Sequence, residues 1–128
     1  LLRGDAGARA LSAWSMSWQP AIEASSGREW LAPFLIEALD DPYAAVRFIA
    51  HRSLTGLPGF EDLEFDYVAP RQDRLRVRNE ARATWSGDAR ALERYGAECF
   101  FDSEGLLDLS AIGNVMSRRD DRVVDLKE

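Results

Sequence analysis

Apolar positions recur at helical spacing through the middle of the chain, between residues 30 and 57. From Leu31 to Leu39 they follow the i, i+3, i+4, i+7, i+8 pattern of one helix face, and a second such face runs from Tyr43 to Leu57. Asp41-Pro42 separates the two faces, and a capping carboxylate before proline is typical of a helix start. Because so short a connection makes two helices lie antiparallel, the sequence predicts a helical hairpin.

The hairpin also carries a family resemblance. Leu35 and Leu39 precede Asp41-Pro42, and Val46-Arg47, Ala50 and Leu54 follow it. This pattern resembles a HEAT repeat, which implies an all-α, HEAT-like solenoid fragment of about five to six helices. The resemblance covers a complete repeat at about 26–57, opened by the S-x-x-E capping box of Ser26 and Glu29. An ordinary hairpin from another all-α domain is the alternative.

A helix is predicted before the hairpin, over residues 5–18. Its apolar positions include Leu11, Trp14 and Trp18, at helical spacing after Gly4-Asp5. We interpret the two tryptophans as core residues, or as the cover of a preceding helix outside this chain. A platform on which a ligand stacks is the alternative. Residues 19–27 are read as a connection.

After Leu57 the helical pattern breaks. Residues 63–68 alternate apolar and acidic side chains, which predicts an irregular extended segment near 60–69. We expect this segment to lie across the helix ends with its aromatic side chains inserted. Its acidic side chains are interpreted as solvated, with a cation or a basic partner as the alternative.

Residues 70–85 are predicted as a helix with an arginine row along one side, although 74–78 also alternate at strand spacing. The row consists of Arg71, Arg74, Arg78 and Arg82. The favoured interpretation is that Asp73, Glu80 and the acidic 61–66 segment pair with it inside the molecule. The alternative makes these four arginines a possible interaction surface for phosphates or an acidic protein.

The last third contains a predicted short helix over 89–95 and a final helical face over 109–116, followed by a short extended tail. Asp102, Glu104 and Gly105 resemble part of a calcium-binding EF-hand loop. Phe100 and Ala111 stand where such a loop needs its first acid and its bidentate glutamate, so we interpret the stretch as a turn. Residues 60–128 together are predicted to close the helical array.

The length, net charge and cysteine content of the chain limit its domain number, its binding partners and its possible cofactors. The chain has 128 residues, a length that predicts a single domain over 1–128. Its net charge of −6 speaks against unspecific binding to nucleic acid or anionic membranes. One cysteine, Cys99, excludes an internal disulfide and a c-type haem attachment. No apolar run approaches the roughly 20 residues of a membrane span. The chain lacks a starting methionine, so we expect a fragment of a longer protein.

No catalytic pattern emerges. His51 is the single histidine and is interpreted as a half-exposed surface residue, while Cys99 is interpreted as a buried small apolar side chain. No glycine-rich phosphate loop or nucleophile motif is present. We therefore predict no catalytic, cofactor-binding or metal-binding residues, no cofactor and no enzymatic activity. The predicted function is a noncatalytic protein-interaction or scaffold module, whose partner is a protein or the remainder of a longer chain.

A second resemblance bears on the cellular setting. Gly4-Asp5-Ala6, residues 30–35, Asp40-Asp41-Pro42-Tyr43 and residues 118–122 look similar to the C-terminal repeat region of large bacterial multihaem c-type cytochrome proteins. That resemblance implies an extracytoplasmic C-terminal cap, and otherwise we expect a cytoplasmic protein. The alternative function is a HEAT-like nucleic-acid-binding enzyme of the DNA glycosylase kind, because such enzymes use tryptophans in a basic groove. The oligomeric state and the identity of the partner stay open.

Overall fold

The computed structural model describes residues 1–24, 31–85 and 108–122, and within those ranges the regular secondary structure consists of α-helices, without strands. The helices are α1 (Ala6–Ser15), α2 (Gln19–Ala24), α3 (Leu31–Ala38), α4 (Ala44–Leu54), α5 (Arg71–Trp85) and α7 (Leu109–Met116). The predicted all-α class is confirmed.

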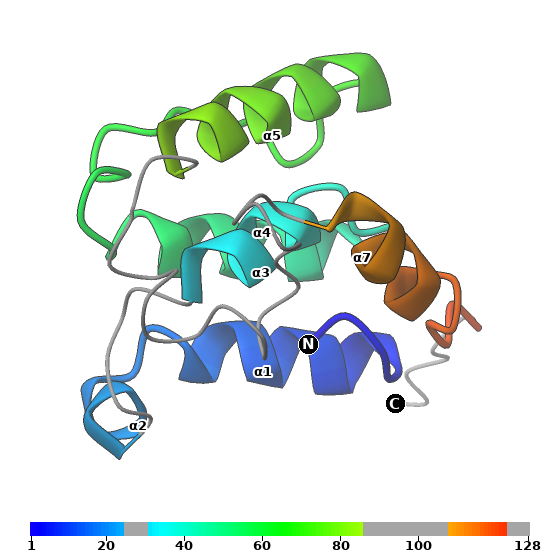
Figure 1. The fold of residues 1–128 in the computed structure, drawn as a ribbon, viewed down its shortest axis with the longest axis horizontal. Helices are drawn as coiled ribbons and strands as arrows, with labels where there is room; N and C mark the ends of the chain where they lie inside the picture. The colour runs from blue at the N-terminus through cyan, green and yellow to red at the C-terminus, as the bar shows by residue number, and fades with distance from the viewer. Residues whose placement is uncertain (25–30, 86–107, 123–128) are drawn as a thin grey trace.

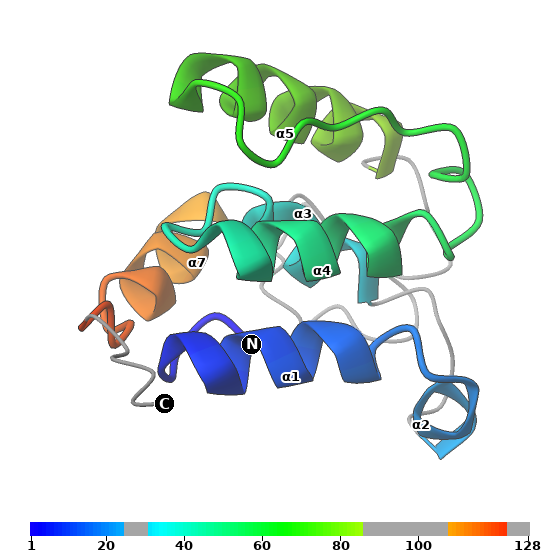
Figure 2. The same ribbon diagram turned by 180° about the vertical axis from the view of Figure 1, so that it is seen from behind.

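The helices are stacked in layers. Figure 1 shows α1 on one side, the α3–α4 pair in the middle and α5 on the other side, and the view from behind in Figure 2 agrees. Helix α4 packs on α1 and on α3, and α3 in turn packs on α5. Helix α7 lies beside one end of this stack, and α2 turns away after α1. The middle layer therefore receives contacts from both sides.

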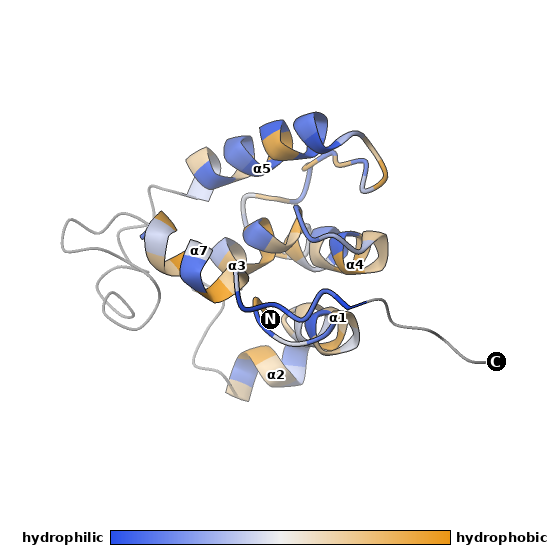
Figure 3. Cartoon of the chain, turned by 90° about the vertical axis from the view of Figure 1, so that its right-hand side faces the viewer, coloured by the Kyte–Doolittle hydropathy of each residue, from blue (hydrophilic) through white to orange (hydrophobic). Residues whose placement is uncertain are grey.

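Helix α3 forms the centre of the core because almost all of its surface is covered. Leu35 and Ile36 are fully buried, although they point to different sides of the helix, and even the charged Glu37 is 1% exposed. A helix that is apolar on most sides is buried all round. In Figure 3 hydrophobic positions occur on all of the helices, and α5 is mostly hydrophilic.

The predicted hairpin is present, but its second helix begins later than expected. Helices α3 and α4 run antiparallel and pack on each other. Helix α4 begins at Ala44 with Tyr43 as its N-cap residue, so Pro42 is not its first helical residue. The carboxylate of Asp41 accepts a hydrogen bond from the Tyr43 backbone amide at 2.9 Å and is shared with an arginine from α1. The corner is thus fixed by a long-range partner as well as by local capping.

Helix α1 begins as predicted but presents a different face to the core. Asp5 caps it, with the Ala8 amide donating to the carboxylate at 2.8 Å. The buried positions of α1 are Ala6, Arg9 and Ala13. Of the apolar row predicted from the sequence spacing, Ala6 is buried, whereas Leu11 and Trp14 face outward. The helix also ends at Ser15, before Trp18.

The structure also tests the helix boundaries and the irregular segment that were predicted from the sequence. Helix α2 occupies a stretch that the sequence suggested was only a connection, whereas α5 is helical throughout, including 74–78. The segment 60–69 is irregular and runs along α4, and its Phe60 is buried while Tyr67 is exposed. The Ser26–Glu29 capping box, the 89–95 helix, Cys99, the 102–105 turn and the extended tail lie outside the described residues.

Candidate functional site

An apolar surface is exposed on the outer side of α1 and in the turn after it. We call it the tryptophan face and define it as Leu11 and Trp14 of α1 and Trp18, which lies between α1 and α2. These side chains are 65%, 50% and 51% exposed. The two indole rings stack, with centroids 5.8 Å apart and planes inclined by 19°. Trp14 and Trp18 are therefore not core residues of the described chain. A contiguous exposed aromatic patch on a helix is characteristic of a surface that another molecule covers.

The inner side of α1 is held by a buried ion pair. Arg9 Nε donates to Asp41 Oδ2 at 2.7 Å and Arg9 Nη2 donates to Asp41 Oδ1 at 3.1 Å, and the two side chains are 1% and 3% exposed. Arg9 Nη1 also donates to the Gly4 carbonyl at 2.6 Å. A bidentate pair of this kind fixes the relative orientation of the groups it joins. It therefore sets which side of α1 faces α4 and which faces outward.

The turn between α3 and α4, which contains Asp41, also contacts two further segments of the chain. Arg47 Nη1 donates to the Asp41 carbonyl at 2.7 Å, and Arg47 Nε donates to the Tyr67 carbonyl at 2.6 Å. Burial and the charge of nearby Arg74 lower the Arg47 pKa. The Tyr43 hydroxyl donates to the Arg122 carbonyl at 2.6 Å. The α3–α4 turn therefore anchors α1, the irregular segment and the stretch after α7.

The stretch after α7 carries an acidic side chain with a shifted pKa. Arg122 Nε donates to Asp120 Oδ1 at 2.8 Å, and this bond, together with the Arg122 backbone amide, lowers the Asp120 pKa to about 2. The Asp120 backbone amide donates to the Gly4 carbonyl at 3.2 Å. Asp120 thus stays ionised over the range in which most carboxylates titrate.

Replacing Arg122 with glutamine is expected to raise the Asp120 pKa from about 2 toward the ordinary value of roughly 3.9. Because the folded pKa lies below the unfolded one, the group stabilises the fold above pH ~4 and loses that contribution as the pH falls toward 2. An NMR titration of the Asp120 carboxyl carbon measures the shift, and an unchanged pKa in the variant would contradict it.

The arginine row of α5 faces two buried carboxylates, those of Glu37 on α3 and of Asp40 in the turn after α3. Arg82 Nε and Nη2 donate to the Glu37 carboxylate, both at 2.6 Å. Arg71 Nη2 lies 2.8 Å from Asp40 Oδ2, and Arg74 Nη2 lies 3.6 Å from Asp40 Oδ1. Arg78 Nη1 lies 3.9 Å from Glu37 and 3.7 Å from Asp40. The row is paired internally, although its partners are not those expected from the sequence.

Four guanidinium groups thus share two carboxylates. Burial and the neighbouring Arg82 lower the Arg78 pKa, whereas the hydrogen bond to Asp40 raises the pKa of Arg71. The Arg71 side chain is 71% exposed, and that of Arg74 is 13% exposed. Whether the row also serves as an interaction surface stays a prediction, with Arg71 its most accessible member.

Replacing Glu37 with glutamine is expected to destabilise the fold by about 1–3 kcal/mol, because the partly buried guanidinium groups of Arg78 and Arg82 lose a charged partner. Chemical denaturation of the variant measures the loss. Glu80→Gln is the matched control, since Glu80 forms an exposed pair with Arg76 at 2.8 Å, and it should change stability by less than about 0.5 kcal/mol. Equal effects of the two substitutions would contradict the pairing of α5 with α3.

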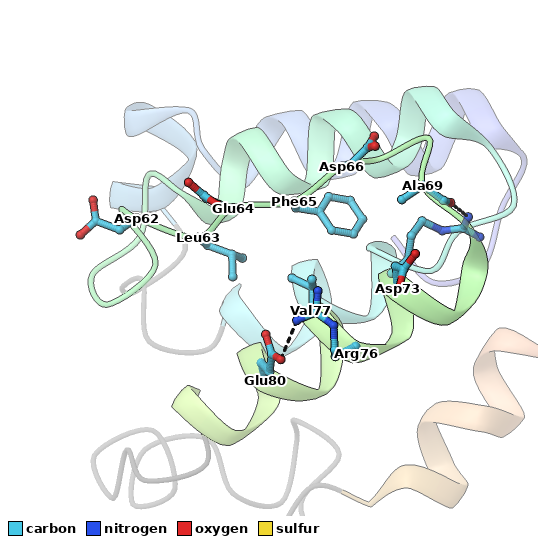
Figure 4. Close-up of a pocket in the computed structure, with 11 residues that line it drawn as sticks. Asp62, Leu63, Glu64, Phe65, Asp66, Ala69, Asp73, Arg76, Val77 and Glu80 are labelled. Carbon is cyan, nitrogen blue, oxygen red and sulfur yellow. Dashed lines mark hydrogen bonds and ion pairs between the residues drawn. The ribbon is translucent and has the colours of Figure 1, made fainter.

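A groove of about 730 Å³ lies on another side of α5, between that helix and the irregular segment. Figure 4 shows Leu63 and Phe65 extending from the segment toward Val77 of α5. Carboxylates line its edges, among them Glu64 and Asp73. The groove has an apolar floor and an acidic rim.

His51 positions the irregular segment. Its Nε2 lies 2.7 Å from the Leu63 carbonyl, and its ring centroid lies 5.5 Å from that of Phe65. It is half-buried, as the sequence suggested. In the described part of the chain, no group of three or more histidine, cysteine, aspartate or glutamate side chains is placed to hold a metal ion.

Sequence reasoning missed the charged side chains that organise these surfaces. Arg9 and Glu37 each stand within an apolar helical stretch, and that position could have indicated that both side chains are buried and paired. A charged residue on an otherwise buried helix is rarely left without a partner.

No helix in the described ranges has the length and apolarity required to cross a bilayer. Comparison of the chain with protein-family models, characterised proteins and solved structures finds no match.

Proposed function

We propose that the chain is a noncatalytic protein-interaction module that binds an apolar helix through the tryptophan face of α1. The observation that carries the proposal is the half-exposed, stacked pair of Trp14 and Trp18 beside the exposed Leu11. Aromatic side chains of this size are enriched among the residues that dominate binding energy. The partner is a separate protein or another part of a longer chain.

The architecture supports this proposal. A HEAT-like plan stacks helix pairs on their neighbours, and each pair covers the apolar side of the next. Here α1 covers α4 with its inner side and leaves an apolar outer side available. A helix packed on that side would continue the stack seen in Figure 1. The scaffold role, including a cap at one end of a larger protein, follows from the same geometry.

The charge distribution does not favour the glycosylase alternative. The arginines that would contact phosphates are paired with Glu37 and Asp40. Trp14 belongs to α1 and Trp18 to the turn after it, and α1 lies at the opposite side of the stack from α5. An enzyme of that kind would need both on one basic surface, and the overall charge of −6 opposes phosphate binding.

Site-specific photo-crosslinking tests the proposal. Benzoylphenylalanine placed at Leu11 and, as a control, at Gln72 of α5 is activated in the cells that produce the protein. Leu11 is 65% exposed and Gln72 is also exposed, so neither replacement disturbs the core. We expect crosslinks from position 11 to apolar residues of one helical segment, identified by mass spectrometry. Equal or absent crosslinking from the two positions would reject the tryptophan face.

A further inference from the structure

The groove between α5 and the irregular segment carries a second inference, which is independent of the tryptophan face. We propose that this groove binds a basic peptide segment that inserts one large apolar side chain between lysine or arginine residues. The floor consists of Leu63, Phe65 and Val77, and the surrounding carboxylates include Glu64 and Asp73.

The floor is suited to an apolar anchor. Leu63 and Phe65 are half-buried, and Val77 is 9% exposed, so they form one apolar surface at the base of an open groove. A volume of about 730 Å³ falls in the range of pockets that hold small ligands, so the groove has room for one large side chain together with neighbouring peptide atoms. A bare cation gains nothing from such a floor, because hard cations are held by converging oxygen ligands.

The acidic rim of the groove favours a positively charged peptide. Five carboxylates border the groove, those of Asp62, Glu64, Asp66, Asp73 and Glu80, together with Arg74 and Arg76. In Figure 4 the Asp62, Glu64 and Asp66 side chains point away from α5, so they stand on the outer edge of the groove, and Glu80 is engaged by Arg76. Both arginines already have partners: Arg74 donates to the Ala69 carbonyl at 2.6 Å, and Arg76 lies 2.8 Å from Glu80. Electrostatic complementarity of this kind favours lysine and arginine side chains on the incoming segment and accelerates its association.

The segment that forms one wall is held in place before any partner arrives. His51 contacts the Leu63 carbonyl and Arg47 donates to the Tyr67 carbonyl, and both side chains belong to α4. The opposite wall, α5, is fixed by its ion pairs to α3. A preformed groove reduces the cost of ordering its walls on binding.

Fluorescence anisotropy with labelled peptides tests the proposal at low and physiological salt. The probe is a peptide of lysines and arginines around a central phenylalanine, and a second probe carries serine in place of phenylalanine. We expect the phenylalanine probe to bind more tightly than the serine probe, and the double variant Glu64→Lys/Asp73→Lys to weaken binding by about tenfold or more. Both substituted side chains are exposed, so the fold is retained and circular dichroism can verify it.

Two controls make the outcome decisive. Glu23→Lys changes an exposed charge on α2, away from the groove, and Trp14→Ala removes part of the tryptophan face. Neither should alter peptide affinity, so failure of one proposal is distinguishable from failure of the other. Three results would overturn the groove as a peptide site: absence of binding at low salt, equal affinity for both probes, or equal weakening of binding by Glu23→Lys and by the Glu64→Lys/Asp73→Lys double variant.

Discussion

Replacing Asp41 with alanine is expected to lower the free energy of unfolding by about 3–5 kcal/mol, which is a large part of the stability of a domain this size. The substitution removes the buried bidentate partner of the Arg9 guanidinium, which is 1% exposed, and leaves it only the half-exposed carboxylate of Asp121 at 3.2 Å. It also removes the acceptor of the Tyr43 amide at the start of α4. Denaturant unfolding followed by circular dichroism measures the change.

A double variant separates the unpaired charge from the loss of the pair itself. Arg9→Met combined with Asp41→Leu removes both charges and keeps most of the side-chain volume, so it should recover part of the stability that Asp41→Ala loses. The Gly4 carbonyl still loses Arg9, the nearer of its two donors, and keeps only the Asp120 amide, so recovery is incomplete. Stability within about 0.5 kcal/mol of the wild type for Asp41→Ala would contradict the role of the pair.

Replacing Leu35 with alanine is expected to cost about 2–5 kcal/mol, because a fully buried side chain at the centre of the core leaves a cavity. Leu11→Ala is the matched control: the same substitution at a 65% exposed position of α1 should change stability by no more than about 0.5 kcal/mol. Thermal and denaturant unfolding measure both. Similar losses at the two positions would show that the outer side of α1 is covered by the same chain.

The helical hairpin was predictable because its pattern depends on local chemistry. The spacing of Leu31, Leu35 and Leu39 marks one face of a helix, and Asp41-Pro42 marks its end. The start of α1 at Asp5 was equally visible, since N-caps are set by adjacent residues. The boundary of α4 was not, because Asp41 is also engaged by Arg9, thirty-two residues away in the sequence.

The orientation of α1 shows why the candidate site was only partly predictable. Apolar spacing assigned Leu11 and Trp14 to the buried side or to a helix outside the chain, but burial of Arg9 turns them outward. Periodicity counts apolar residues and gives no weight to a charged side chain that finds a buried partner. The same reason hid Glu37 and Asp40 as the partners of the arginine row.

The proposed interaction role is tested most directly by hydroxyl-radical footprinting of Trp14 and Trp18. Oxidation of these two side chains is compared between the isolated chain and the protein in the cells that produce it, with the exposed Tyr67 as internal reference. The account predicts that both tryptophans are oxidised in the isolated chain and strongly protected in cells, while Tyr67 changes less. Equal oxidation of Trp14 and Trp18 in the two settings would contradict it.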